Sequence, residues 1–527
     1  MKTSNCITKV LFICIVIVAT RTAVAAGARA EGQWFELKDN TPFRVPVGER
    51  QLFLDDYGIA SIHCLARTMH QPAKKGAVIR SDPAKSGSIQ IRSAPFWVSE
   101  EKVFKLLVAD TSGPRSVYRW YESADGLHWT AGQKPNWGEL AVVYDAQDPD
   151  PARRYKAMET DTWHGMSWHE ECTGGFYVSP DGIDWTQIKS PGFPSQDEHN
   201  ISFDERGHTF LLTTKCRGPN GRSHSLGTSK DFENWTNHGL IFHADGMDQE
   251  LGRERIKTYL ADPTRVGSVP EHEADYTVDV YNFGLFRYEG LYVGLPSMHH
   301  HITRRPPPPW DDSLFHLVQL TCSRDLKSWK RLGGRRPWLD ISRLDSGAYD
   351  SGSILPPSAP IVRGPGCLDG ADKLSKDQLW FYYTACKAEP APDSFAICLA
   401  ILRRDGFVSL DAGRKVGTII TMGFTVPGEK LFVNVDASRK VSAAMSGYGG
   451  ESVEVIKNVK PTSKSELRVD VLGKSGEVLA TSVPIKGDDH SRIEVKWQKG
   501  NIADLKGKLV SLRFKLNNAR FYSYWLE

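Results

Sequence analysis

The sequence predicts an all-β protein, a five-bladed β-propeller followed by a C-terminal β-sandwich. Three observations lead to this fold class. A short turn motif recurs between residues 123 and 409, and a run that reads as a β-strand precedes each copy. The last hundred residues hold short alternating strands and lack the motif.

The turn motif is a serine, an aspartate two positions later and a tryptophan four positions after that. Its copies are SADGLHW at 123–129, SPDGIDW at 179–185, SKDFENW at 229–235 and SRDLKSW at 323–329, with a degenerate copy, RDGFVS, at 404–409. An apolar strand, a tight turn and an aromatic residue opening the next strand are typical of a β-hairpin. We expect the aspartates of all five copies to stabilise outer turns, because Asp bonds its own turn backbone.

The aspartates of these copies lie at 125, 181, 231, 325 and 405, so their spacings are 56, 50, 94 and 80 residues. A propeller blade of four strands takes roughly 40–50 residues, and the longer spacings therefore predict insertions, at 243–275 and 299–312. Three strands are expected ahead of each turn: 93–99, 103–110 and 117–122; 139–144, 154–160 and 175–178; 199–203, 208–215 and 224–228; 281–288, 291–296 and 315–322; 353–362, 378–386 and 395–402. No long helix is predicted.

The domain boundaries follow from this pattern. We assign residues 45–420 to the propeller and residues 421–527 to the sandwich, an accessory domain. The expected sandwich strands are 431–436, 467–472, 478–483, 493–497, 509–516 and 519–525.

The N-terminus predicts a secretory signal peptide at residues 1–25. Lys2 and Lys9 precede an apolar run at 10–19, and small residues follow at 23–25, which is the order of a signal peptide with its cleavage site. An uncleaved anchor is the alternative, but the apolar run is about half of the ~20 residues that a membrane span needs. The expected location is secreted or periplasmic, with no membrane span after cleavage.

Charge and cysteine content narrow the function classes. Residues 1–25 carry three basic residues and no acid, so their removal takes the formal charge from +3 to 0. A neutral protein gives no electrostatic reason to expect a nucleic acid as partner. Seven scattered cysteines would remain, which is neither a disulfide framework nor a zinc motif; Cys386 and Cys398 are the best candidates if a pair forms.

The candidate site is the mouth of the central channel, because the first strand of every blade lines that channel. Blade two opens with WGE at 137–139, blade three with DEHN at 197–200, blade four with DVYN at 279–282 and blade five with YDS at 349–351. The candidate catalytic residues are Asp197, Glu198, Asp279 and Asp350, and the candidate substrate-binding residues near them are His199, Asn200, Tyr281, Asn282 and His299. Glycosidic-bond cleavage needs one protonated and one ionised carboxyl group, and crowded carboxylates divide these roles by separating their pKa values.

Each candidate also has a structural interpretation. A carboxylate at a strand start is more often a turn former than a catalyst, so the set is more informative than its members. The run His299-His300-His301 could bind a metal, but adjacent residues on a strand point to opposite faces, and a place at the substrate rim is favoured. We therefore predict no metal and no cofactor.

The chain resembles the five-bladed propeller glycoside hydrolases of families 32, 43, 62 and 68, and most closely secreted family-32-like proteins of planctomycete-type bacteria. The similar stretches are LFLDDY at 52–57, HQP at 70–72, DVYN at 279–282, YDSG at 349–352 and NARFYS at 518–523. The resemblance adds His70 to the substrate-binding candidates. Members of this superfamily use an aspartate of the first blade as nucleophile or base, whereas this chain has RSAP at 92–95.

The sequence thus predicts a secreted glycoside hydrolase acting on poly- or oligosaccharides. Asp197 and Asp279 would be the ionised carboxylates, Glu198 the acid and Asp350 a modulator. The alternative is a non-catalytic glycan-binding propeller on the cell surface, which the missing first-blade acid favours. A third class, a protein-interaction scaffold, would require a flat, apolar channel mouth.

Overall fold

The computed structural model describes residues 43–527 except 83, 85–87, 112–115, 139–140, 160–171, 267–275, 304–310, 390, 439–441, 447–451 and 457–464. The predicted signal peptide at 1–25, Glu139 and the proline run at 306–309 lie outside the described residues. Among the described residues, no helix combines the length and the apolar character that crossing a membrane requires.

Five antiparallel sheets follow one another along residues 73–403, and we number them 1 to 5. Sheet 1 contains β5 (Ile89–Gln90), β6 (Phe96–Val98), β7 (Val103–Asp110), β8 (Val117–Ser123) and β9 (Thr130–Ala131). Sheet 2 contains β10 (Val142–Tyr144), β11 (Tyr155–Met158), β13 (Phe176–Ser179) and β14 (Thr186–Gln187). Sheet 3 contains β16 (His199–Asp204), β17 (Thr209–Gly218), β18 (Gly221–Ser229) and β19 (Trp235–Phe242).

Sheets 4 and 5 depart more from the expected strands. Sheet 4 contains β20 (Tyr276–Tyr288), β21 (Leu291–Thr303), β22 (Asp311–Val318), β23 (Thr321–Ser323) and β24 (Lys330–Arg331). Sheet 5 contains β25 (Ser353–Leu355), β26 (Ile361–Arg363), β27 (Gln378–Cys386), β28 (Phe395–Arg403) and, from the start of the chain, β4 (Ala73–Arg80). The three histidines of the expected 299–312 insertion therefore lie within strand β21, not in a loop.

Buried apolar side chains join each sheet to the next. Shared clusters connect sheet 1 with sheet 2 (Leu107 and Tyr155), sheet 2 with sheet 3 (Phe176 and Phe210), sheets 3, 4 and 5 together (Leu211, Phe283 and Phe381), and sheet 5 with sheet 1 (Trp380 and Phe104). The series is thus closed. A separate pair of strands, β12 (Cys172–Gly174) with β15 (Phe193–Ser195), lies between sheets 2 and 3 in chain order without belonging to either. Because of this extra pair, and because residues 160–171 are not described, the count of five blades stays a prediction.

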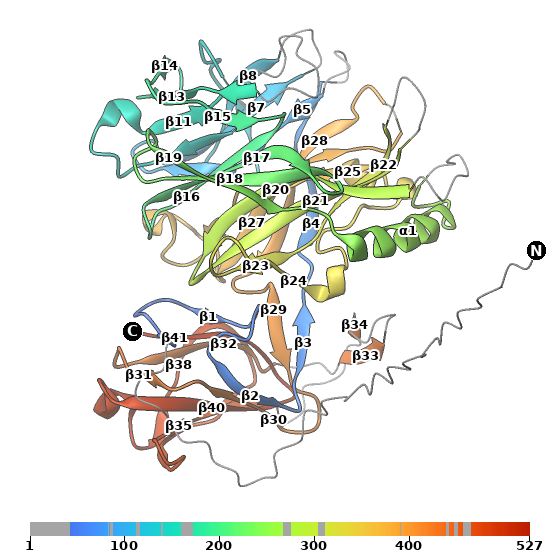
Figure 1. Cartoon of the computed structure of the whole chain (residues 1–527). Coiled ribbons are helices and arrows are strands. Elements are labelled where there is room, and N and C mark those ends of the chain that lie inside the picture. Colours follow the sequence, from blue (N-terminus) through green and yellow to red (C-terminus); the bar gives the residue numbers. More distant parts are fainter. Residues whose placement is uncertain are drawn as a thin grey trace, which may run out of the picture.

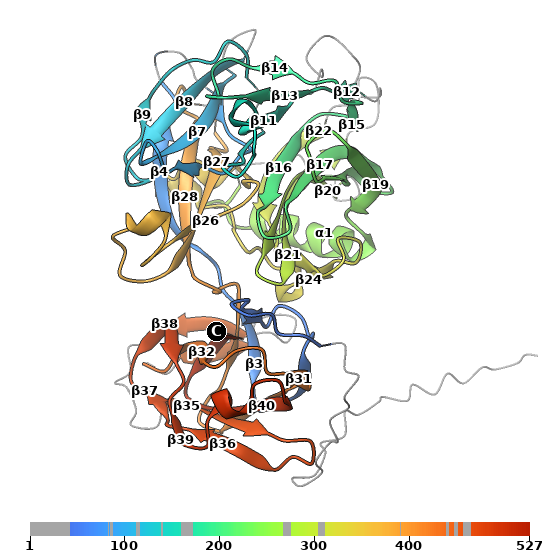
Figure 2. The same ribbon diagram turned by 90° about the vertical axis from the view of Figure 1, so that its left-hand side faces the viewer.

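The sandwich consists of two sheets, drawn below the other five in Figures 1 and 2. One contains β1 (Gln51–Leu52), β3 (Ala66–Met69), β29 (Val408–Asp411), β32 (Leu431–Asp436), β38 (Asp489–Glu494) and β41 (Arg520–Leu526). The other contains β2 (Ile59–His63), β30 (Gly417–Thr421), β31 (Phe424–Thr425), β35 (Glu466–Leu472), β36 (Val478–Ser482), β37 (Ile485–Lys486), β39 (Trp497–Lys499) and β40 (Leu509–Asn517). Strand β33 (Ser442–Ser446) pairs with β34 (Ser452–Ile456). The predicted fold class, all-β with a propeller and a sandwich, is confirmed.

Strand pairing does not follow the predicted boundaries at residues 45 and 421. Strands β1, β2 and β3 precede β4 in the chain but pair with β41, β30 and β29. Residues 51–69 and 408–421 therefore belong to the sandwich, because their strands pair within its two sheets and not within the ring, the closed series of sheets 1 to 5.

One long helix, which the sequence did not predict, lies in the 243–275 insertion. Helix α1 (Gly246–Leu260) begins with a capping box between Asp245 and Asp248, an arrangement that satisfies the free N–H groups of the first turn. Figure 1 shows α1 beside the ends of β21 and β22, and the Gln249 side chain hydrogen-bonds both backbone groups of Val278 on β20. Other helices among the described residues are short 3₁₀ turns: η2 (Pro151–Arg153), η4 (Gly333–Arg335), η5 (Leu344–Ser346), η6 (Tyr349–Ser351), η7 (Leu368–Gly370) and η8 (Ile502–Leu505).

Four of the repeated turns have the expected structure. In the third copy, Asp231 Oδ1 accepts hydrogen bonds from the backbone N–H groups of Glu233 (2.9 Å) and Asn234 (2.8 Å) and from the Ser229 hydroxyl (3.0 Å). The aspartates at 125, 181 and 325 make the same three bonds. The next residue has a positive φ in each copy: Gly126, Gly182, Phe232 and Leu326.

The degenerate copy differs, and the prediction of an outer-turn role for Asp405 is wrong. Asp405 itself has the positive φ, 61°, so it takes the position of the glycine and not of the capping aspartate. Its side chain is fully buried between sheet 4 and the sandwich. It accepts hydrogen bonds from Arg50 (2.7 Å), Tyr288 (2.6 Å), Ser523 (2.5 Å) and Asn434 (2.9 Å), and so connects the ring to the sandwich.

The two cysteines considered as a pair do not form a disulfide. Cys386 lies opposite Phe395 and Cys398 opposite Tyr383 in the register of sheet 5, and both are free thiols.

Candidate functional site

The start of sheet 3 supplies two adjacent carboxylates. Asp197 and Glu198 come directly before β16, and the neighbouring strand β17 places Lys215 beside them, with its N–H donating to the Glu198 carbonyl (3.0 Å). The Lys215 ammonium forms an ion pair with Asp197 and lies 3.9 Å from the centre of the Tyr281 ring. Tyr281 of sheet 4 thus packs against the lysine that pairs with Asp197, the first carboxylate of sheet 3.

Glu198 is held by an arginine of sheet 1. The Arg92 guanidinium, itself buried, bonds both carboxylate oxygens of Glu198. The Asn282 amide donates to Glu198 Oε2 (3.2 Å) and accepts from Asn200 (2.9 Å). Side chains from sheets 3 and 4 and from the segment between β5 and β6 of sheet 1 therefore meet at this carboxylate, and the contribution of sheet 1 is a cation.

This environment decides the charge of Glu198. Burial alone would raise the pKa of the carboxyl group, but the positive charges of Arg92 and Lys215 outweigh it and lower the pKa of Glu198 to about 2. A charged neighbour favours the ionised form in this way. Glu198 is therefore ionised at neutral pH, and the prediction that it is the protonated acid disagrees with its surroundings.

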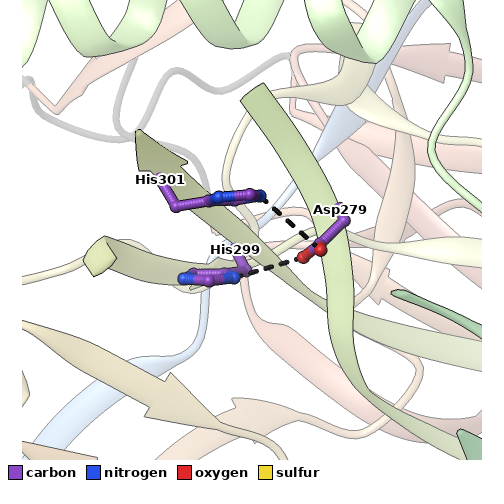
Figure 3. A group of neighbouring side chains, drawn as sticks. All are labelled: Asp279, His299 and His301. Atoms are coloured by element: carbon purple, nitrogen blue, oxygen red, sulfur yellow. Dashed lines mark hydrogen bonds and ion pairs between the residues drawn. The ribbon is translucent and has the colours of Figure 1, made fainter. Parts of the chain in front are cut away.

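The third predicted carboxylate lies on sheet 4 among histidines. Asp279 Oδ1 is 3.2 Å from His299 Nδ1, and Asp279 Oδ2 is 3.6 Å from His301 Nε2 (Figure 3). Arg222 of β18 binds Asp279 Oδ2 through its side chain (2.9 Å) and its backbone N–H (3.2 Å). The Tyr281 ring centre is 5.8 Å from that of His299 and 4.7 Å from that of His316. Tyr281 thus lies between the Asp197–Lys215 pair and the Asp279 group.

The titration of the Asp279 group follows from burial and pairing. Burial raises the pKa of Asp279, but hydrogen bonds from His299 and His301 and the charge of Arg222 hold it well below its usual value. Burial lowers the pKa of His299 to about 4. The same cause lowers the pKa of His199, the predicted binding residue next to Glu198, to about 4. The imidazoles of His299 and His199 are therefore neutral at pH 7.

Two predicted site residues lie elsewhere. Asp350, in η6, pairs with Lys74 (2.7 Å) and accepts from the Tyr383 hydroxyl (2.8 Å). It lines a separate pocket of about 230 Å³ over one face of sheet 5, together with Lys74, Tyr349 and Tyr383. His70 follows β3 at the sandwich, where it bonds Ser409 (2.7 Å) and packs on Tyr522. Each position has a physical reason. The turn η6 places Asp350 against a face of sheet 5, and His70 lies at the sandwich because the strand before it, β3, pairs with β29.

Four residues of the cluster are not among the predicted site residues: Arg92, Lys215, Arg222 and His301. Arg92 and Lys215 pair with carboxylates of other segments, and no local sequence pattern indicates such contacts. A register argument could have found His301, since it lies two positions after His299 and side chains two apart share a face of a strand.

The chain was compared with family models, curated proteins and solved structures, and similarities were found among the solved structures alone. No family model matches the chain, and no curated protein matches it. Among solved structures, the chain is similar to a GH32 beta-fructofuranosidase of Bombyx mori (10% identity, 85% of this chain and 95% of that one, TM-score 0.37). It is also similar to a glycosyl hydrolase from Bacteroides ovatus (12% identity, 67% and 96%, TM-score 0.36) and to an endo-arabinase from Bacteroides thetaiotaomicron (14% identity, 63% and 96%, TM-score 0.32).

At these identities and TM-scores the similarities carry no argument about the chemistry of the site. The resemblance to planctomycete-type proteins stays a prediction, and the function has to be argued from the residues themselves.

Proposed function

We propose that this chain is a secreted, glycoside hydrolase-like protein that acts on poly- or oligosaccharides at the cluster around Tyr281. The observation that supports this most is the convergence of carboxylates from two sheets on one tyrosine, with Asp197 on one side and Asp279 on the other. Paired carboxylates are what glycosidic-bond cleavage uses.

The charge balance of the cluster fits a neutral sugar. The carboxylates of Asp197, Glu198 and Asp279 pair with Lys215, Arg92 and Arg222, respectively. These six groups carry no net charge, and the neutral imidazoles of His199 and His299 add none, so nothing in them selects an anionic ligand. The donors and acceptors instead suit hydroxyl groups, and this polar character does not fit the flat, apolar mouth that a protein-interaction scaffold needs.

In this proposal Asp197 is the carboxylate that acts on the substrate. Its side chain is 15% exposed, against 4% for Asp279, so Asp197 is the easier of the two to reach. Tyr281 stays protonated, because the charge of Glu198 raises its pKa to about 12, and its hydroxyl serves as a hydrogen-bond donor. Asn200 and Asn282 orient the sugar through their amides, with Glu198 holding Asn282.

A second candidate is a non-catalytic glycan-binding protein. The observation that favours it is the ionised state of Glu198, whose proton a hydrolase would need for the leaving oxygen. A binding protein needs no such proton, and the same amides and carboxylates would then only recognise hydroxyl groups.

One experiment separates the two candidates. The mature protein and its Asp197→Asn and Tyr281→Phe variants would be tested on p-nitrophenyl glycosides and plant and algal oligosaccharides, with turnover measured by released sugar and binding by calorimetry. Turnover that falls at least 100-fold in Asp197→Asn supports the hydrolase, on the scale that acid–base groups contribute.

The matched control is Asp325→Asn, which changes an aspartate of an outer turn. Sugar binding without turnover in the wild type, weakened in Tyr281→Phe, supports the glycan-binding protein. Neither turnover nor binding of any sugar overturns both candidates, and equal losses in Asp325→Asn would remove the site assignment.

A further inference from the structure

We infer that Asp279, His299 and His301 form a binding site for one divalent transition-metal ion, with Zn²⁺ as its representative. All three side chains are buried, and one ligand atom of each lies within 4.8 Å of the others. The inference rests on this geometry alone and holds whether or not the protein cleaves sugars.

The register of sheet 4 explains how the three side chains meet. Asp279 on β20 lies directly opposite His299 on β21, and Thr277 lies opposite His301. Side chains two apart share a face of a strand, so His299 and His301 both point toward Asp279, as Figure 3 shows. Their rings stack with centres 4.4 Å apart. His300 points the other way and bonds Arg255 of α1 (2.9 Å).

The distances agree with a metal centre. Zinc binds imidazole nitrogen and carboxylate oxygen at about 2.0–2.2 Å in tetrahedral geometry, which sets its ligand atoms about 3.3–3.6 Å apart. His299 Nδ1 lies 3.2 Å from Asp279 Oδ1 and His301 Nε2 lies 3.6 Å from Asp279 Oδ2. One ligand atom from each residue lies within 4.8 Å of the others, so a small adjustment of the side chains brings all three to the zinc distances. Two imidazoles and one carboxylate make a donor set for zinc and other first-row metals, whereas calcium and magnesium prefer oxygen ligands.

Neighbouring groups hold these ligands in place. The Thr277 hydroxyl lies 3.3 Å from His301 Nδ1, the ring nitrogen that would not bind the ion, and Arg222 fixes Asp279 from β18. Arg222 is 27% exposed, whereas Asp279, which it binds, is 4% exposed. Gly221, with φ +96°, brings the tip of the β17–β18 hairpin so close that a Cβ there would lie 3.0 Å from Asp279 Oδ2. Outer partners of this kind orient metal ligands.

Three protein ligands leave a fourth position for water or a substrate oxygen, which is the pattern of catalytic zinc sites as opposed to structural ones. The site adjoins Tyr281, whose ring centre is 5.8 Å from that of His299. A bound ion would thus add one Lewis-acidic position next to the cluster around Tyr281.

The test is metal binding by the mature protein, purified without a polyhistidine tag and treated with a chelator. Zn²⁺ is titrated by calorimetry, and Co²⁺ is added as a probe whose visible absorption reports its geometry. We expect one ion per chain and tetrahedral-type Co²⁺ bands. Replacing a ligand in His301→Gln or His299→Gln should weaken binding by about 100-fold or more, since loss of an outer partner alone costs 10–100-fold.

His128→Gln is the matched control, because His128 is an exposed histidine that also bonds an aspartate, Asp125 (2.7 Å), at a turn. It should leave stoichiometry and affinity unchanged. Circular dichroism and melting temperature of the metal-free variants establish that each is folded. Absence of Zn²⁺ binding to the wild type at 1 mM, on the order of the weakest site affinities known in proteins, overturns the inference. Equal affinity in folded His299→Gln and His301→Gln overturns it too.

Discussion

Asp405 offers the sharpest test of how the ring and the sandwich are joined. The carboxylate is fully buried and receives Arg50, Tyr288, Asn434 and Ser523, which come from the N-terminal segment, sheet 4 and the sandwich. The Arg50 guanidinium also stacks 3.8 Å from the centre of the Trp525 ring. We predict that Asp405→Ala lowers the free energy of unfolding more than any single change in the outer turns.

The magnitude follows from what the substitution leaves behind. Removing one partner of a buried ion pair costs about 3–5 kcal/mol, because the other charge stays buried without compensation. The Arg50 side chain is 9% exposed, and the carboxylates that still face it are farther away, Glu289 at 4.0 Å and Asp377 at 3.9 Å. It also keeps its hydrogen bond to the Ser491 carbonyl (3.3 Å) and its stacking on Trp525. Losing the aspartate that caps an outer turn should cost about 1 kcal/mol, so Asp325→Ala is the control.

The assay is urea unfolding at several pH values, followed by circular dichroism. Burial raises the pKa of Asp405, but the charges of Arg50 and Arg404 outweigh it and hold the pKa far below its usual value. A depressed carboxyl pKa adds stability above the unfolded pKa of about 3.9, and this stability is lost as the pH falls below it. The difference between wild type and Asp405→Ala should therefore be full at pH 7 and shrink below about pH 4. A loss no larger than that of Asp325→Ala at pH 7 would refute the reasoning.

Two further substitutions probe the candidate site. Arg92→Met should destabilise the protein by about 3–5 kcal/mol at pH 7, because Glu198 then lacks its arginine partner. The pKa of Glu198 is lowered to about 2, so the stability difference between wild type and variant should shrink as the pH falls from about 4 toward 2. A stability difference in urea unfolding that does not change with pH would contradict this prediction. Gly221→Val should lower the melting temperature more than Gly239→Val. Both glycines have a positive φ, but a Cβ at Gly221 would lie 3.0 Å from Asp279, whereas a Cβ at Gly239 would have no atom within 4 Å. Equal shifts in melting temperature would show that backbone strain is the whole effect.

Much of the fold could be predicted because the turn motif repeats a local interaction. The Ser229–Asp231 capping pattern depends on neighbours within five residues, so the sequence carries it completely. Helix α1 was missed because it buries only Asp248, Gly252 and Ile256 and lacks an apolar stripe. Its position depends instead on a capping box and on contacts with β20, which begins 16 residues after the helix ends.

The candidate site was predicted in part, for a similar reason. Asp197, Glu198 and Asp279 could be singled out because they lie at or near the start of first strands, just before β16 and four residues into β20, where the blade geometry brings distant residues together. The charge state of Glu198 could not be predicted, since it depends on Arg92, which is 106 residues away in the chain. The partners of Asp279 depend on the register between β20 and β21, which hydrophobic alternation alone does not fix.

The path of the polypeptide between its two parts has a practical consequence. The chain runs from sandwich strand β3 into β4, passes through all five sheets, and returns from β28 to sandwich strand β29. Two connections, at residues 70–72 and 404–407, therefore link the parts, and cutting one leaves the other intact. A fragment beginning at residue 421 would lack strands from both sandwich sheets, so excising this module for expression by itself calls for fusing residues 43–69 to residues 408–527.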